Sequence, residues 1–250
     1  MANDPIHQFR LHDLVGPVNI AGYEISFTNS ALFMGIIVAT ITGILLLSAR
    51  KGALVPGRLQ LVGEMWYGLV DNMVTSIMGE DGKKFFPFVF SIFSFVLMAN
   101  LIGLFPYFFT VTSHVIITEA MAFFIIGLVV VVGITKHGLG WFKLFVPHGV
   151  PMVILPFISL IEIISFLSRP LSLGLRLFGN MLAGHIVLKV FAGFVVTLSA
   201  LGFGGVLGSI LPLGMTVALT ALEFLVAFLQ AFVFATLACV YLNDALHPGH

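Results

Sequence analysis

Long apolar runs alternate with short polar connections along most of this chain. The first run, Ser30 to Ala49, contains about 20 residues, which is enough for a helix to cross the roughly 30 Å hydrocarbon core of a bilayer. Two further runs of this kind extend from Phe85 to Phe109 and from Val115 to Thr135. Their length and continuous apolar character predict three membrane-spanning helices before the middle of the chain.

The segment from Leu59 to Gly79 has a different pattern. Apolar residues recur in it at helical spacing, and polar residues lie between them. The apolar set is Val62, Met65, Trp66, Leu69, Met73 and Ile77, and the polar set is Gln60, Glu64, Asp71, Asn72 and Thr75. This pattern favours a helix that lies in the cytoplasmic membrane interface. Because the segment is only moderately polar, a buried re-entrant helix is the alternative.

The C-terminal part of the chain contains apolar stretches that are too long for one upright crossing. No turn signal interrupts Pro156 to Leu201, and a continuous helix of that length measures roughly 65 Å. Such a helix fits the membrane only if it tilts steeply or bends, and Pro170 is the natural place for a bend. A glycine-rich turn from Gly202 then precedes a second long helix, which we expect to end near Leu242. The pattern predicts an antiparallel hairpin of two overlong, strongly tilted helices.

Basic residues gather at three connections and set the expected orientation. They are Arg50, Lys51 and Arg58 after the first run, Lys83 and Lys84 before the second, and Lys136, His137 and Lys143 after the third. Because cytoplasmic loops carry an excess of Lys and Arg, we expect these connections in the cytoplasm and the N-terminus outside. Residues 1–29 lack the basic start and apolar run of a signal peptide. We therefore expect an outside segment (1–29), peripheral helices (30–145) and the long hairpin (146–250).

The composition agrees with a polytopic all-α membrane protein. Hydrophobic residues make up 59% of the chain and charged residues only 9%, whereas soluble domains carry about a quarter charged residues. The formal net charge is zero, so no basic face is available for nucleic acid. With Cys239 as the single cysteine, neither an intrachain disulfide nor a metal cluster is expected. The P-loop pattern is absent, so we expect no direct ATP binding and no catalytic site on this chain.

Arg176 lies in the middle of a membrane-length apolar stretch, where a fixed positive charge is costly. An arginine near the bilayer centre costs about 3 kcal/mol on insertion scales, and it does not lose its proton. Such a residue indicates an ion or proton path, or a site for a counter-ion. A snorkelling arginine near a helix end is the alternative, but the apolar flanks of Arg176 exceed the reach of its stem. Glu119, within the third run, is another costly charge unless it lies in a surface loop.

One face of the first long helix carries most of its polar residues. At about 100° per residue, five polar residues fall within about 60° of one another. These are Glu162, Ser165, Arg169, Arg176 and Asn180. His185 and Lys189 are one turn apart and point nearly the opposite way, in the half of the helix nearer the outside.

The second long helix carries Glu223 and Gln230 on one face. Partners in an antiparallel pair have a nearly constant sum of residue numbers, which matches His185 with Glu223 and Arg176 with Gln230. Isolated interhelical hydrogen bonds, worth about 0.6 kcal/mol each, would explain Gln230 or Asn180 alone. They would not explain a titratable pair together with a buried arginine. The pattern indicates two proton-accessible paths, one from each side, separated by a fixed cation.

Three motifs of this chain resemble subunit a of the F-type ATP synthase. They are SRPLSLGLRLFGNMLAGH (Ser168–His185), NLIGLFPY (Asn100–Tyr107) and EFLVAFLQAFVF (Glu223–Phe234). The resemblance extends from about residue 25 to the C-terminus, and the arginine motif is its most specific part. It implies that Arg176 is the essential arginine of the family, which keeps two half-channels apart.

The resemblance also assigns the other polar residues. Asn180 and Gln230 match the polar neighbours of the essential arginine, and Glu162 matches the carboxyl of the cytoplasmic half-channel. The order His185 then Glu223 is that of mitochondrial and alphaproteobacterial members, whereas enterobacterial members carry Glu then His. The expected outside half comprises His185, Glu223, Gln230, Asn180 and Glu119, and the expected cytoplasmic half comprises Glu162, Ser165 and Arg169.

The partners implied by the resemblance are a ring of c-subunits, each with a membrane-embedded carboxylate, and b-type peripheral stalk subunits. The long hairpin is expected to pack against the ring, in the lipid bilayer, and protons are the translocated ion. No cofactor and no metal are expected. The bacterial inner membrane is the expected location, and the mitochondrial inner membrane is the alternative.

Two other functional classes fit the residues less well. A secondary transporter predicts a repeated half, but the segment SLGLRLFGN has no second copy in the chain. A structural scaffold would not require Arg176, His185 and Glu223 at compatible depths.

Overall fold

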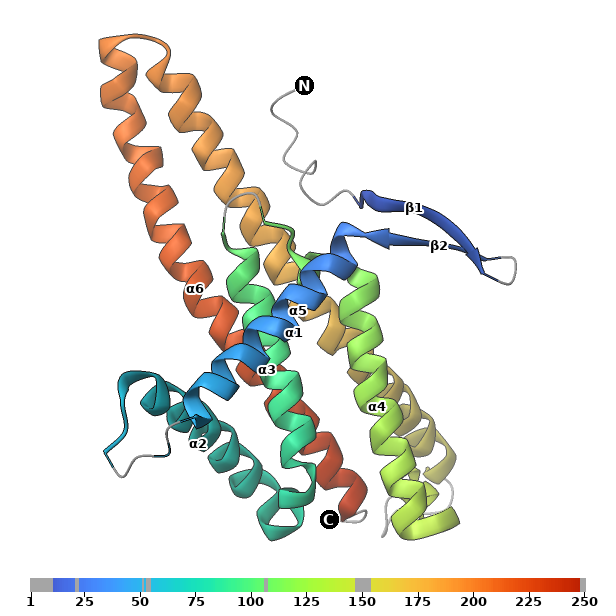
Figure 1. The fold of residues 1–250 in the computed structure, drawn as a ribbon. Coiled ribbons are helices and arrows are strands. Elements are labelled where there is room, and N and C mark those ends of the chain that lie inside the picture. Colours follow the sequence, from blue (N-terminus) through green and yellow to red (C-terminus); the bar gives the residue numbers. More distant parts are fainter. Residues whose placement is uncertain are drawn as a thin grey trace. The chain divides into compact units, whose positions relative to one another are not determined.

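The computed structural model describes residues 11–20, 23–50, 52, 55–105, 108–146 and 154–247 (Figure 1). Its strands are β1 (Asp13–Ile20) and β2 (Tyr23–Thr28). Its α-helices are α1 (Asn29–Ala49), α2 (Arg58–Met78), α3 (Phe86–Gly103), α4 (Val115–His137), α5 (Leu155–Ser199) and α6 (Phe203–Leu246). Short 3₁₀ segments are η2 (Gly79–Phe85), η3 (Val111–Ser113) and η4 (Gly138–Phe145).

Five helical segments in the described part of the chain are long and apolar enough to cross a membrane. They are Asn29–Ala49, Arg58–Gly103, Val115–His137, Leu155–Ser199 and Phe203–Leu246. The second of these contains both α2 and α3, and α2 is the more amphipathic of the two. The predicted class of five spans with an additional amphipathic helix is therefore confirmed.

Some boundaries differ from the prediction. The expected crossing from Phe85 to Phe109 is wrong at its end, because α3 stops at Gly103. Pro106 follows in the sequence, and the residues before a proline disfavour the helical conformation. In contrast, α6 continues past the expected end at Leu242 to Leu246. Lys51, Pro106, Tyr107 and part of the N-terminal segment lie outside the described residues.

A β-hairpin precedes the first helix and was not anticipated from the sequence. Strands β1 and β2 pair antiparallel, with Asp13 opposite Thr28 and Ile20 opposite Tyr23. Two register shifts interrupt the ladder between Asp13 and Val18. The backbone N–H of Asn29 donates to the carbonyl of His12 at 3.0 Å, so the start of α1 is tied to the residue before β1.

The chain forms two compact units, and α5 and α6 contribute residues to both. The first unit comprises residues 1–46, 94–114 and 177–231. Its fully or nearly buried apolar residues are Ile37, Val96, Ala99, Phe109, Val111, Leu177, Met181, Ala227 and Ala231. The turn between α5 and α6 lies in this unit and places Gly202 at φ 88°, a conformation that glycine adopts without steric cost.

The second unit comprises residues 47–93, 115–176 and 232–250. Its buried apolar residues include Val70, Met73, Val74, Val89, Phe93, Ala122, Ile125, Val129, Phe166, Phe234 and Leu242. Trp141 of η4 packs edge-on against Phe145 and Phe166, with ring centroids 5.5 and 5.8 Å apart. Aromatic side chains thus link η4 to α5.

Alanines form the buried side of α6 in both units. Ala227, Ala231, Ala235, Ala238 and Ala245 are fully buried. Small side chains allow helix backbones to approach closely, which is the usual basis of helix association in membranes.

Polar contacts in the second unit join two of the basic connections to the C-terminal end of α6. Asp81 of η2 lies 4.0 Å from Lys136 Nζ at the end of α4 and 3.6 Å from His247 Nε2. His137 Nε2 donates to the carbonyl of Leu246 at 3.0 Å. These contacts agree with the expectation that both connections lie on one side of the membrane.

Lys83, on the connection between α2 and α3, forms a local ion pair. Lys83 Nζ lies 2.6 Å from Glu80 Oε2, and this hydrogen bond raises the pKa of the exposed Lys83. The ammonium therefore stays charged, which is the state that the positive-inside rule requires.

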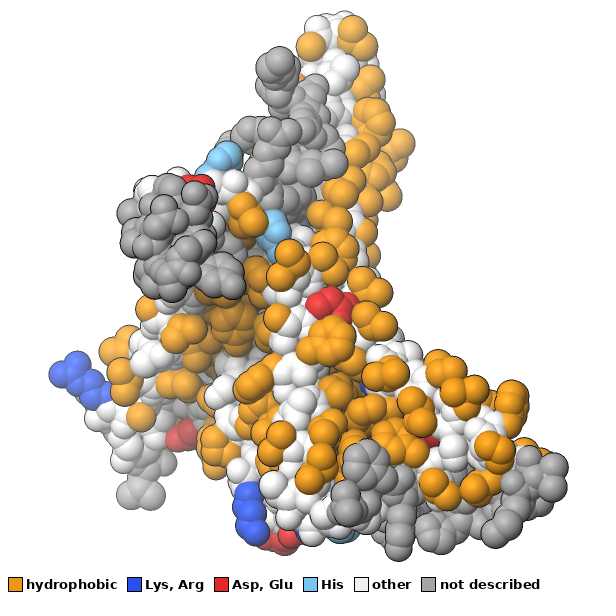
Figure 2. Space-filling model, turned by 90° about the vertical axis from the view of Figure 1, so that its right-hand side faces the viewer, with side chains coloured by type: hydrophobic (Ala, Val, Ile, Leu, Met, Phe, Trp, Pro, Cys, Tyr) orange, Lys and Arg blue, Asp and Glu red, His pale blue; other side chains and the backbone are white. Residues whose placement is uncertain are grey.

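The outer surface of the helices is largely apolar. Figure 2 shows hydrophobic side chains over most of the described surface on that face, with few charged groups among them. Exposed large residues such as Phe124, Ile164, Leu211 and Val217 have more than half of their surface accessible. Such extensive apolar exposure suits contact with lipid or with other membrane subunits and does not suit water.

We predict that Gly133→Ala destabilises the second unit by about 1–3 kcal/mol, the usual cost of overpacking. A methyl group at position 133 would overlap the indole of Trp141. The control is Gly127→Ala on the same helix, where a methyl group meets nothing within 4 Å. The midpoint of thermal unfolding in membranes should fall for the first variant only, and equal midpoints would contradict the packing described.

Candidate functional site

Arg176 lies on the exposed surface of α5, within the second unit. Its Nη2 atom donates to Ser172 Oγ, one turn earlier on the helix, at 3.4 Å. Asn180, one turn later, is also exposed. The guanidinium of Arg176 and the amide of Asn180 are therefore both exposed at the surface of the subunit, although the surrounding helix surface is apolar.

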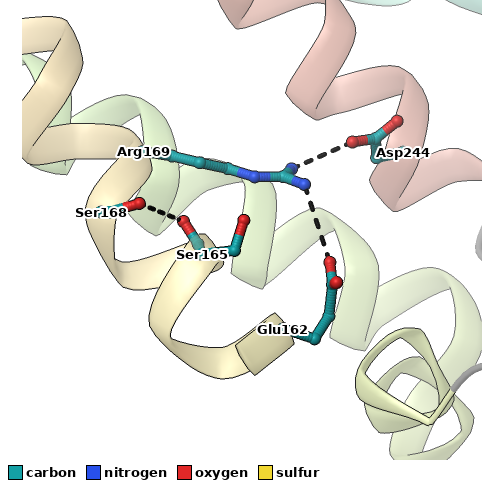
Figure 3. A network of polar contacts seen from close by, with 5 residues as sticks. All are labelled: Glu162, Ser165, Ser168, Arg169 and Asp244. Carbon is teal, nitrogen blue, oxygen red and sulfur yellow. Dashed lines mark hydrogen bonds and ion pairs between the residues drawn. The ribbon is translucent and has the colours of Figure 1, made fainter. Parts of the chain in front are cut away.

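A second arginine on α5 is held inside the protein by two carboxylates. Arg169 Nη1 donates to Asp244 Oδ2 on α6 at 3.0 Å, and Arg169 Nη2 lies 4.0 Å from Glu162 Oε1 (Figure 3). Ser168 Oγ donates to the backbone carbonyl of Ser165 at 2.7 Å beside this group. The predicted cytoplasmic residues Glu162 and Arg169 are thus brought together, and Ser165 stays exposed.

Aromatic rings complete the environment of Arg169. Its Cζ atom lies 5.8 Å from the ring centroid of Phe166 and 5.1 Å from that of Tyr241. Guanidinium groups within about 6 Å of such rings gain from the ring quadrupole. The arginine is therefore fixed by charge, hydrogen bonding and stacking, which leaves the two carboxylates in defined positions.

Asp244 was not identified from the sequence. It lies in the last turn of α6, where an acidic residue also suits a solvated helix end, so position alone did not distinguish it. The antiparallel register that aligns His185 with Glu223 also runs from Arg169 toward the last turns of α6. That register could have indicated the last turns of α6 as the region that contacts Arg169.

His185 lies in the first unit and is only 8% exposed. Its Nε2 atom is 3.2 Å from Thr110 Oγ1. Thr110 belongs to the segment between α3 and η3, and its hydroxyl also donates to the carbonyl of Gly103 at 3.2 Å. The histidine on α5 is thus linked to the C-terminal end of α3.

Glu223 of α6 lies directly against α5 at Gly184, the residue before His185. A methyl group at Gly184 would overlap Glu223 Oε1 and lie 3.0 Å from its Cδ. Both carboxylate oxygens are shielded from solvent and make no hydrogen bond of ordinary geometry within the described residues. The glycine therefore provides the space in which this carboxylate sits, one residue from the histidine.

A buried network of neutral groups surrounds this part of the first unit. Thr112 Oγ1 donates to Asn100 Oδ1 at 2.8 Å, and Asn100 Nδ2 donates to the carbonyl of Ala227 at 3.2 Å. Asn100 and Thr112 are fully buried. These bonds connect α3, η3 and α6. The α6 member, Ala227, lies four residues after Glu223.

The remaining predicted residues have distinct environments. Gln230 is buried in the first unit, with 7% of its surface exposed. Glu119 is in the second unit, where a methyl group at Gly174 would lie 2.6 Å from its Cδ. Within the described residues, no group of three or more His, Cys, Asp and Glu side chains is arranged to hold a metal ion.

Comparison with known proteins identifies the family of this arrangement. The family model for the ATP synthase A chain matches residues 31–243. The chain belongs to the ATP synthase A chain family. It is 64% identical over 247 residues to an ATP synthase subunit a of Mesorhizobium japonicum, which covers 99% of this chain and 98% of that relative. Subunits from a Chelativorans species and from Brucella anthropi are 62% and 60% identical over 250 residues, the full length of both chains.

Membership in this family settles several predictions. The chain is a multi-pass membrane protein and the proton-conducting stator subunit of the membrane sector, and it is a non-catalytic member of a translocase complex. The bacterial relatives indicate the inner, or plasma, membrane as its location. The resemblance found in the three sequence motifs is confirmed.

We predict that Gly184→Ala reduces ATP-driven proton pumping at least about fivefold, because overpacking costs roughly 1–3 kcal/mol and here displaces the Glu223 carboxylate. Acidification of inverted membrane vesicles measures the effect. The matched control is Gly193→Ala on the same helix, where a methyl group meets nothing within 4 Å. Adding Glu223→Asp to Gly184→Ala should recover part of the loss, since the acid is then shorter. Equal pumping by the two single variants would show that the contact is unimportant.

Proposed function

We propose that this subunit provides two offset aqueous half-channels, which carry protons to and from a rotating ring of c-subunits. The observation that carries the proposal is the exposure of Arg176 on an apolar helix surface. A permanent charge facing hydrocarbon costs several kcal/mol. A membrane subunit with a carboxylate is proposed to approach the exposed guanidinium.

The proposed partner is a ring of subunits, each with a carboxylate within the membrane. A carboxylate that passes Arg176 is held deprotonated by the adjacent positive charge. Because arginine does not release its proton, Arg176 also blocks direct proton flow between the half-channels. Asn180, exposed one turn away, is proposed to contact the same ring surface, and b-type stalk subunits are proposed to hold the stator.

His185 and Glu223 are proposed to form the outside half-channel. Both are shielded groups in the first unit, and the Glu223 carboxylate lies against the residue that precedes His185. Histidine and glutamate can each be tuned by their surroundings to exchange protons near neutrality. Gln230, in the same unit, is assigned to this half as a polar lining residue, and the assignment of Glu119 to it stays a prediction from the sequence.

Glu162 and Asp244 are proposed to form the cytoplasmic half-channel, with Arg169 as the cation between them. Their separations from Arg169 of 4.0 and 3.0 Å make one charged cluster in the second unit. The carboxylates are proposed to carry protons that leave the ring, and the hydrogen bond and ion pair to Arg169 hold them in place. Ser165 is assigned to the same path. A membrane potential supplies about 2.3 kcal/mol per proton per 100 mV to drive this flow.

The two proposed half-channels are distinguished by cysteine accessibility. Single cysteines replace Glu162 and Glu223 in a Cys239→Ser background, within the intact ATP synthase. Position 162 should react with small hydrophilic thiol reagents from the cytoplasmic face and position 223 from the outside, because only a hydrated thiol ionises and reacts. Cys239→Ser alone is the control. Labelling of both positions from one face would mean a continuous pore and would exclude the proposed mechanism.

We predict that Arg176→Lys lowers ATP-driven proton pumping at least about tenfold, since a hydrogen bond to a charged group is worth roughly 1.5–3 kcal/mol and lysine lacks the planar fork. The complex should still assemble. Arg58→Lys, an exposed site at the start of α2, serves as the matched control and should pump normally. Normal pumping by Arg176→Lys in inverted vesicles would remove Arg176 from its proposed role.

A further inference from the structure

We propose that Thr110 is a positioning residue that keeps the proton of the neutral His185 ring on Nε2, so that protons join and leave His185 at Nδ1. The inference rests on the proposed role of His185 in the outside half-channel. The inference goes beyond that role by naming the nitrogen of His185 that binds the proton and the hydroxyl that determines which nitrogen it is.

Thr110 is held in place by its surroundings. The residue is 1% exposed, and its backbone carbonyl accepts from the N–H of Ser113 at 3.2 Å. The following segment is tied to α3 through the bond from Thr112 to Asn100. A buried hydroxyl on such a fixed backbone has few alternative positions.

The approach of Thr110 to α3 depends on the glycine at the helix end. A methyl group at Gly103 would lie 2.6 Å from Thr110 Cγ2 and 3.1 Å from Thr110 Oγ1. Gly103 is the last residue of α3, and the final carbonyls of a helix have no intrahelical donor. The Thr110 hydroxyl supplies a donor to the Gly103 carbonyl at 3.2 Å.

Counting protons then fixes the direction of the bond to His185. A hydroxyl has one proton, and a backbone carbonyl can only accept. Because Thr110 gives its proton to Gly103, Oγ1 must accept from His185 Nε2, which lies 3.2 Å away. The neutral ring therefore carries its proton on Nε2, and Nδ1 is the basic nitrogen.

This assignment determines how a proton passes His185. An incoming proton binds Nδ1 and gives an imidazolium, and the same N–H bond breaks when the proton leaves. Relay through the ring is blocked, because the chain from Nε2 through Thr110 ends on an amide carbonyl, which is a very weak base. Among the described residues, Lys189, one turn along α5, is a charged group that acts on the ring, and Glu223 of α6 lies against the preceding residue, Gly184.

Nitrogen-15 magic-angle-spinning NMR of the reconstituted ATP synthase, with ¹⁵N-histidine in this subunit, tests the assignment. His185→Gln identifies the His185 signals by their loss. At alkaline pH, the wild-type protein should show a protonated Nε2 and a bare Nδ1. Thr110→Ser should keep this pattern, whereas Thr110→Val, which has the same shape without a hydroxyl, should give a mixture of tautomers. Thr118→Val is the control, since Thr118 is buried in the second unit and donates to Val115 at 3.1 Å.

Proton flux provides the second measurement. Thr110→Val should lower flux about five- to tenfold, which corresponds to one hydrogen bond of about 1 kcal/mol, while Thr110→Ser and Thr118→Val stay near wild type. A wild-type proton on Nδ1, an unchanged tautomer in Thr110→Val, or a loss in Thr110→Ser equal to that in Thr110→Val would each overturn the inference. Normal flux in His185→Gln would instead exclude His185 from the proton path. Because the tautomer is measured independently of flux, the NMR result separates failure of the proposed role of His185 from failure of the proposed role of Thr110.

Discussion

The cost of placing a charge in hydrocarbon without a partner constrains most of this structure. The two arginines of α5 illustrate the two ways of meeting that cost. Arg169 is neutralised within the chain by Glu162 and Asp244 and is stacked on two rings. Arg176, two turns later, is exposed. One arginine of α5 is thus enclosed by carboxylates of its own chain, whereas the other is exposed on the surface of the subunit, where a neighbouring membrane subunit is proposed to approach it.

Neutral polar groups obey the same constraint in a milder form. The amide of Asn100 and the hydroxyls of Thr110 and Thr112 are nearly or fully buried, and each has a bond of 2.8–3.2 Å to a partner on another segment. Such bonds join the end of α3 to α5 and α6 at the level of His185. Groups that must be satisfied because water is absent thereby become the groups that fix the geometry of the site.

Helices α1 and α4 were predictable because their apolar runs have the length that one membrane crossing requires. The bounds of α1 and α4 agree with the expected Ser30–Ala49 and Val115–Thr135 to within two residues. The β-hairpin was missed although β2 (YEISFT) alternates apolar and polar residues, because Gly16 and Pro17 interrupt the pattern of β1 (DLVGPVNI) and both residue types are disfavoured inside strands. Arg176, Glu162, His185 and Glu223 could be proposed as site residues from the sequence because charge is costly in apolar runs, and helical spacing grouped them. Thr110 was not singled out because it lies between α3 and η3, where helical periodicity does not apply, although it contacts a residue 75 positions away. Asp244 was not singled out because the register of the hairpin indicates only the last turns of α6 as the region opposite Arg169 and not the individual residue.

The fully buried alanines of α6 have a mechanical consequence. A longer side chain can yield to a load by changing rotamer, whereas alanine has no side-chain torsion that repositions a heavy atom. The buried side of α6 therefore deforms only if whole backbones move, and closely packed backbones resist compression. A subunit that must remain stationary beside a turning rotor benefits from such stiffness. Elastic energy during rotation would then be stored in longer and softer parts of the complex, and the spacing of the residues proposed to exchange protons would be preserved under torque.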